Sequence, residues 1–211
     1  MNDNIQSPDM LFRKIYFSLL ILFITWNLSA QVTMTFDVLP YHEIPAAPET
    51  FTAENTVARM IDGLGFRYFW ATEGLQTTDL SYRPTEGARS CEETLDHIMG
   101  LSIMILNAVQ NKTNVRSGEE TSPAQFAVKR KTTLDNLKKA SDLLKERGSD
   151  LNKVTIKFKN KDQKSEFPAW NLINGPISDA LWHAGQVVSF RRSSGNPINP
   201  KVNVFTGKLN D

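Results

Sequence analysis

Two histidines and one aspartate are the residues of this chain whose types and spacing could do chemistry. His97 lies in one strongly apolar segment, and Asp179 and His183 lie four residues apart in another. On a helix this spacing advances about 6 Å and turns about 40° beyond a full circle, so both side chains share one stripe. Two imidazoles and a carboxylate are typical ligands of a divalent metal ion, with coordination positions left for water or substrate.

The segment that carries Asp179 and His183 has helix signals at both ends. Gly175 can serve as the N-cap and Pro176 fits the first turn, while Gly195 is a typical C-terminal stop. Most side chains between these ends are apolar, which predicts a helix over residues 174–192 that is buried on most sides. Gln186 falls on the same stripe as the two candidate ligands, one turn after His183.

His97 lies in a second predicted helix, over residues 91–109, which opens with a capping box of Ser90 and Glu93. Each histidine lies within about a turn of the middle of its helix, so packing of the two helices would bring the imidazoles to one level. A histidine bonded only to Asp179, with a carboxylate favoured by the positive end of its helix, is the simpler alternative.

The remaining elements complete the predicted fold. A first helix runs from Thr50 or Thr52 to about Gly74. A third runs from Ser122 and Pro123 to about Arg147, with residues 129–131 on its exposed face. Residues 154–168 predict a small hairpin or ordered loop before the last helix. The predicted fold class is therefore all-α, an antiparallel four-helix bundle of one domain.

The chain begins with the pattern of a secretory signal peptide. Arg13 and Lys14 precede an apolar run over residues 15–28, and small residues follow. We expect residues 1–30 to be a signal peptide, residues 31–50 an extended leader, residues 51–193 the bundle and residues 194–211 a C-terminal tail. Export to the periplasm or the extracellular space is the expected location. An uncleaved run over 15–28 would instead anchor the protein in a membrane, and Met10 is an alternative start to Met1.

Composition and charge limit the classes of binding partner that we expect. The formal net charge is +1, which gives no electrostatic reason to expect nucleic acid as a partner. The basic residues between Lys129 and Lys164 alternate with acidic ones, which is typical of a solvated face. Cys91 is the only cysteine, so there is no disulfide framework, and a small core residue is its simplest role.

Three stretches resemble the DinB-like superfamily of helical bundles, which includes the YfiT-type proteins. They are ARMIDGLGFRYFWATEGL, TLDHIMG and DALWHAGQVVSFRR, and the resemblance covers residues 52–192. It implies a divalent metal held by one histidine of the second helix and a His-x-x-x-His pair of the last. His97 and His183 match the first and third of these positions. Asp179 departs from the middle one, although the similar maleylpyruvate isomerase branch has a carboxylate there.

The resemblance implies nickel, zinc or iron as the cofactor, and an aspartate favours a harder or more weakly held ion. It also implies a metal-dependent hydrolase or thiol transferase that acts on an unknown small molecule, with the ion held dry in the bundle. Gln186 could orient a ligand, and Arg67 and Tyr68 could contact substrate. Low-molecular-weight thiols are chiefly cytoplasmic, so export favours hydrolysis or plain binding.

A non-catalytic DinB-like binding or interaction module, with a vestigial metal site, is the alternative function. In that case Asp179 and His183 form a structural hydrogen bond. Homodimers are common among similar bundles, but no stripe of this sequence requires one.

Overall fold

The computed structural model describes residues 38–115, 125–146, 149–160 and 163–211. The predicted signal peptide and anchor, and the predicted helix start at Ser122 and Pro123, lie outside these ranges. Residues Leu39–Asp211 form one unit. Within the described ranges, every helix is too short or too polar to cross a membrane.

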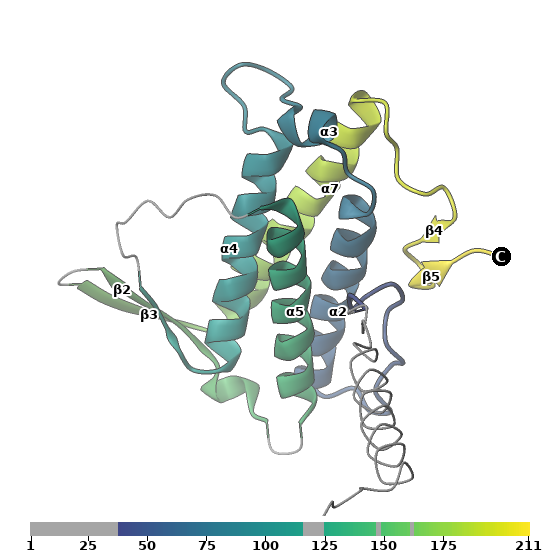
Figure 1. Cartoon of the computed structure of the whole chain (residues 1–211). Helices are drawn as coiled ribbons and strands as arrows, with labels where there is room; N and C mark the ends of the chain where they lie inside the picture. The colour runs from purple at the N-terminus through teal and green to yellow at the C-terminus, as the bar shows by residue number, and fades with distance from the viewer. Residues whose placement is uncertain (1–37, 116–124, 147–148, 161–162) are drawn as a thin grey trace, which may run out of the picture. The chain divides into compact units, whose positions relative to one another are not determined.

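Four long helices pack side by side (Figure 1). They are α2 (Ala53–Thr72), α4 (Cys91–Val109), α5 (Phe126–Lys145) and α7 (Ser178–Ser193). α5 packs against α2 and α4, and α7 packs against the same two helices. Local signals fix their starts: the Thr52 side chain caps α2, and the predicted capping box of Ser90 and Glu93 opens α4.

The directions of the helices differ from the predicted antiparallel order. Lys129, in the first turn of α5, pairs with Asp96 near the start of α4 at 2.6 Å, so these consecutive helices begin at the same end. Lys129 was also predicted on the exposed face, and it is fully buried because Asp96 and Glu92 neutralise its charge.

Two small sheets correct the all-α prediction. β2 (Thr155–Asn160) and β3 (Gln163–Pro168) form the predicted hairpin, which extends away from the helices (Figure 1). β1 (Thr113–Val115) pairs with β2 in parallel, and β4 (Val202–Asn203) pairs with β5 (Lys208–Leu209) in the tail. β1, β4 and β5 are only two or three residues long, too short to show a periodic pattern, so they were not predicted. The fold is mostly helical with these two sheets added.

The last helical segment starts earlier than predicted. α6 (Ala169–Leu172) leads through a π-helical turn, η2 (Ile173–Ile177), into α7. Gly175 lies inside this segment with non-helical φ and ψ of −90° and −105°, so it marks a kink and not the N-cap. α7 is also less buried than its apolar sequence predicted. Trp182 is 73% exposed and Leu181 43%, because α2 and α4 cover only part of its circumference.

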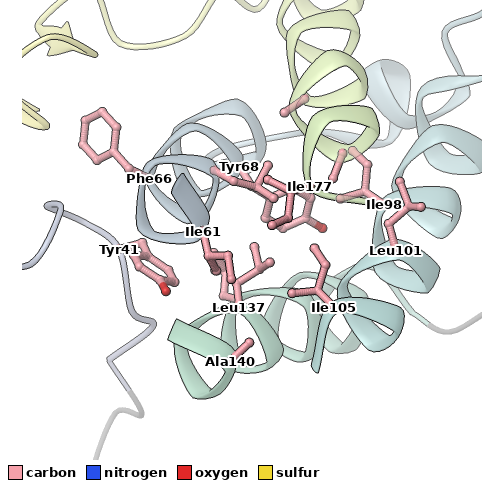
Figure 2. Close-up of a cluster of buried hydrophobic side chains, with 14 of the residues drawn as sticks. Tyr41, Ile61, Phe66, Tyr68, Ile98, Leu101, Ile105, Leu137, Ala140 and Ile177 are labelled. Atoms are coloured by element: carbon pink, nitrogen blue, oxygen red, sulfur yellow. The ribbon is translucent and has the colours of Figure 1, made fainter. Parts of the chain in front are cut away.

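The core lies between the long helices. Figure 2 shows Ile61 of α2, Ile105 of α4 and Leu137 of α5 among its buried side chains. Cys91 is fully buried at the start of α4, which confirms its predicted core position. Burial raises the pKa of its thiol to about 11, so the thiol stays protonated and unreactive at neutral pH.

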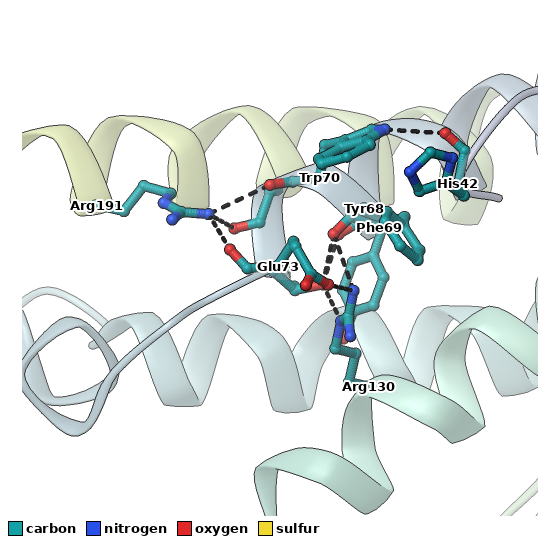
Figure 3. Close-up of polar contacts among 9 residues, drawn as sticks. His42, Tyr68, Phe69, Trp70, Glu73, Arg130 and Arg191 are labelled. Carbon is teal, nitrogen blue, oxygen red and sulfur yellow. Dashed lines mark hydrogen bonds and ion pairs between the residues drawn. The ribbon is translucent and has the colours of Figure 1, made fainter. Parts of the chain in front are cut away.

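The C-terminus of α2 is held by two arginines from other helices (Figure 3). Arg191 of α7 donates from Nη1 to the carbonyls of Trp70, Ala71 and Glu73 at 3.2, 3.1 and 2.8 Å. Arg130 of α5 pairs with the Glu73 carboxylate at 2.5 Å. Last-turn carbonyls have no partner within their own helix, so the three Arg191 contacts satisfy groups that would otherwise be buried and unpaired.

The residues before α2 lie against that helix. The Tyr41 hydroxyl donates to the buried carboxylate of Asp62 at 3.0 Å, and the indole of Trp70 donates to the His42 carbonyl at 3.1 Å. The amide of Ile44 donates to the Gly207 carbonyl in the tail at 2.8 Å. These three hydrogen bonds hold the leader against α2 and against the loop between β4 and β5.

Asp79, in the short helix α3 (Thr77–Ser81), gives the fold a testable pH dependence. Burial alone would raise the pKa of this carboxyl, but hydrogen bonds from Ser194, Asn196 and the Gln76 amide outweigh it and lower the pKa. The ionised form therefore stabilises the folded state above the unfolded pKa of about 3.9, and this contribution is lost as the pH falls further.

We expect Asp79→Asn to lower the free energy of unfolding more at pH 7 than at pH 3. Urea unfolding of both proteins at the two pH values measures the difference. An equal loss at both values would contradict a role for the ionised carboxylate.

Candidate metal centre

His97, Asp179 and His183 converge from α4 and α7. His97 Nε2 lies 3.1 Å from Asp179 Oδ2, and His183 Nε2 lies 3.2 Å from Asp179 Oδ1. The two imidazole rings are perpendicular, with centroids 4.7 Å apart. One ligand atom from each residue lies within 4.8 Å of the others. The carboxylate of Asp179 therefore lies between two imidazole rings, and each ring faces it with its Nε2 atom.

Helix packing sets this arrangement. Asp179 and His183 lie one turn apart in the first half of α7, and the contact of α7 with α4 brings His97 opposite them. The kink at Gly175 lies in η2, just before α7, and separates α7 from the helical turn that precedes it. Asp179 is in the first turn of α7, where the helix dipole also favours a negative charge.

The cluster lies at the edge of the helices and not in a dry core. The exposed fractions of the side chains of His97, Asp179 and His183 are 32%, 42% and 15%. This corrects the expectation of an enclosed site, because Asp179 and His183 lie at the margin of the face that α7 buries. Gly100, one turn after His97, has open space where a side chain would stand. Water and small solutes can therefore reach the three groups.

Gln186 orients the ring of His183. Its Oε1 lies 2.7 Å from His183 Nδ1, while Nε2 of the same ring faces Asp179. A neutral imidazole has one N–H, so it cannot donate to both acceptors at once. If Nδ1 donates to the Gln186 carbonyl, Nε2 presents its lone pair toward Asp179.

Arg67 and Tyr68 lie elsewhere on α2. Tyr68 is fully buried in the core, and burial raises the pKa of its hydroxyl well above the ordinary value. Arg67 Nη1 donates to the Gly63 carbonyl at 3.0 Å. In the part of the chain that the structure describes, neither side chain makes a hydrogen bond or ion pair with His97, Asp179 or His183. A substrate contact by Arg67 or Tyr68 therefore stays a prediction.

Two further aromatic side chains, His42 and Trp182, differ in their position relative to the cluster. His42 packs its ring against Phe69 and Trp70, with centroids 5.7 and 5.0 Å apart, and takes no part in the cluster. Sequence reasoning did not identify Trp182 as a neighbour of the site. Its position three residues after Asp179 turns it only about 60° from that side chain, which was a usable signal.

Comparison with known proteins assigns no family to the chain, because no family model, curated protein or solved structure matches it.

Proposed function

We propose that His97, Asp179 and His183 bind a divalent metal ion, and that α2, α4, α5 and α7 form a four-helix bundle of the DinB-like kind around one side of it. The observation that carries the proposal is the Asp179 carboxylate, which faces Nε2 of both histidines at 3.1 and 3.2 Å. Imidazoles and carboxylates whose donor atoms face one another in this way are a common set of metal ligands in helical bundles.

The donor atoms fit a small ion. Ligand atoms at about 2.0 to 2.2 Å from a tetrahedral centre lie roughly 3.3 Å from each other. Nε2 of His97 lies near this separation from Oδ2 of Asp179, and Nε2 of His183 from Oδ1, and one ligand atom of each residue lies within 4.8 Å of the others. Gln186 favours the tautomer of His183 whose Nε2 lone pair faces the cluster, which is the form that ligates a metal. Two imidazoles and a carboxylate suit nickel, zinc or iron.

A metal-dependent hydrolase acting on a small molecule is the reaction class that we propose. An ion held by these three residues would keep open coordination positions, and it would lower the pKa of a bound water and so supply a nucleophile. The partial exposure of the cluster would let substrate reach those positions. Thiol transfer is the second reaction class, and export of the protein, which the signal-like N-terminus favours, makes hydrolysis the better choice.

A non-catalytic module is the alternative, and one observation favours it. Asp179 already lies within hydrogen-bonding distance of Nε2 of both histidines, and Gln186 Oε1 lies 2.7 Å from His183 Nδ1. In that case Asp179→Ala would lower the melting temperature, and added metal would leave that of the wild type unchanged. A rise with metal would count against this function, since an ion that binds the folded state stabilises it.

The metal content of the purified protein tests the proposal. We expect about one equivalent of nickel, zinc or iron in the wild type, and at least a tenfold loss in His183→Ala because one of three ligands is gone. His42→Ala is the matched control, since it removes a histidine outside the cluster. Mass spectrometry of the metals and circular dichroism of the three proteins give content and folding. Equal, negligible metal in the wild type and in His183→Ala would remove the proposal.

A further inference from the structure

A hollow of about 300 Å³ lies between α2 and α7, away from the candidate metal centre. Met60 of α2, Leu181 of α7 and Phe205 of the loop between β4 and β5 line it. Leu181 is two residues after Asp179, which turns it about 160° around the helix. The hollow and the metal ligands therefore lie on opposite sides of α7.

The lining gathers apolar side chains that the fold leaves exposed. Met60 is 39% exposed, Leu181 43% and Phe205 96%. Val204, beside Phe205, is 50% exposed and lines the same hollow. Single exposed apolar residues are ordinary, but several on one concave surface indicate a binding site.

Two arginines of α2 line the same hollow, Arg59 and Arg67. Each is half-buried, and each donates to a backbone carbonyl: Arg59 to Pro45 at 2.6 Å and Arg67 to Gly63 at 3.0 Å. Among the ion pairs of the described residues, neither has a carboxylate partner. A half-buried cation without an anion costs free energy, so both positions favour a ligand of negative charge.

Arg67 has the better geometry for such a ligand. Its guanidinium lies over Gly63, and the absence of a side chain at Gly63 leaves space for it. A Cβ at that position would stand 3.3 Å from Nη1. The Nη1 bond to the Gly63 carbonyl leaves the donors on Nε and Nη2. That edge of the fork matches the two oxygens of one carboxylate. Arg59 is eight residues earlier, about 12 Å along the helix, and cannot share the same head group.

We infer that this hollow binds a small amphiphilic carboxylate, with its head group on Arg67 and its aliphatic chain against Met60, Leu181 and Phe205. A single available edge of one guanidinium suits a carboxylate better than a doubly charged phosphate. A volume of about 300 Å³ is at the lower end for ligand sites and suits a chain of medium length. The site does not depend on the metal ion.

Calorimetric titration of the full chain with octanoate at pH 7 tests the inference. Octanoate should bind the wild type, and at least tenfold more weakly to Arg67→Gln. Arg192→Gln is the matched control, because it removes the same charge from an exposed position of α7 and should leave binding unchanged. Acetate, which lacks the chain, and 1-octanol, which lacks the charge, should each bind at least tenfold more weakly than octanoate.

Leu181→Asn supplies a second test, since it removes part of the apolar lining and keeps Arg67. It should weaken octanoate binding by at least fivefold without changing the helical circular dichroism. Absence of octanoate binding to the wild type, or equal binding to Arg67→Gln, would overturn the inference. So would a dimer in sedimentation experiments that Leu181→Asn dissociates, because a second copy would then cover the hollow.

Discussion

Replacing Arg191 by Met should lower the free energy of unfolding by about 3 to 5 kcal/mol. The side chain is only 3% exposed, and it donates to three carbonyls at the end of α2 and to the carbonyl and side chain of Asn196 (Figure 3). Methionine fills similar volume but leaves these acceptors buried without donors. Urea unfolding at pH 7 measures the loss.

Arg192→Met is the control, because the neighbouring arginine is exposed, and its effect should stay within about 0.5 kcal/mol. Arg191→Lys should fall between the two, since lysine keeps the charge but not the planar fork. A loss below about 1 kcal/mol for Arg191→Met would show that the α2 carbonyls find other donors.

Gly65→Ala should lower the free energy of unfolding by about 2 to 4 kcal/mol, although alanine is the better helix former. A methyl group at this position would overlap the ring of Tyr41, which packs directly on the backbone of α2. The ring must move, and its hydroxyl then loses the hydrogen bond to Asp62. The buried pair of Asp62 with Lys145 at 2.6 Å becomes exposed to water.

Gly100→Ala is the matched control, because it is also inside a helix but has open space where the methyl group would stand. It should raise stability by up to about 1 kcal/mol. Thermal or urea unfolding of the two variants measures the contrast. If both glycine variants are stabilised, the leader does not hold to α2 through Tyr41.

Features set by neighbouring residues could be predicted from the sequence. The capping box at Ser90 fixed the start of α4, and alternation predicted the β2–β3 hairpin. The convergence of His97 with Asp179 and His183 followed from their spacing on apolar helices. The close packing of the Tyr41 ring on Gly65, in contrast, had no counterpart in these local signals.

Features set by distant residues could not be predicted in this way. Lys129 looked like a surface lysine, and only its pairing with Asp96 of α4 accounts for its burial. Arg191 stands in the last turn of its own helix, but its side chain binds the end of α2, which lies about 120 residues earlier in the chain. The exposure of the metal cluster likewise depends on how much of α7 is covered by α2 and α4. The sequence of α7 alone does not determine this coverage.

Anomalous diffraction from crystals grown with zinc tests whether His97, Asp179 and His183 bind a metal ion. We expect one peak at about 2.0 to 2.2 Å from Nε2 of His97, Nε2 of His183 and one oxygen of Asp179. Crystals of His183→Ala should lack it. The claim is contradicted if wild-type crystals show the three side chains bonded to one another with no peak between them.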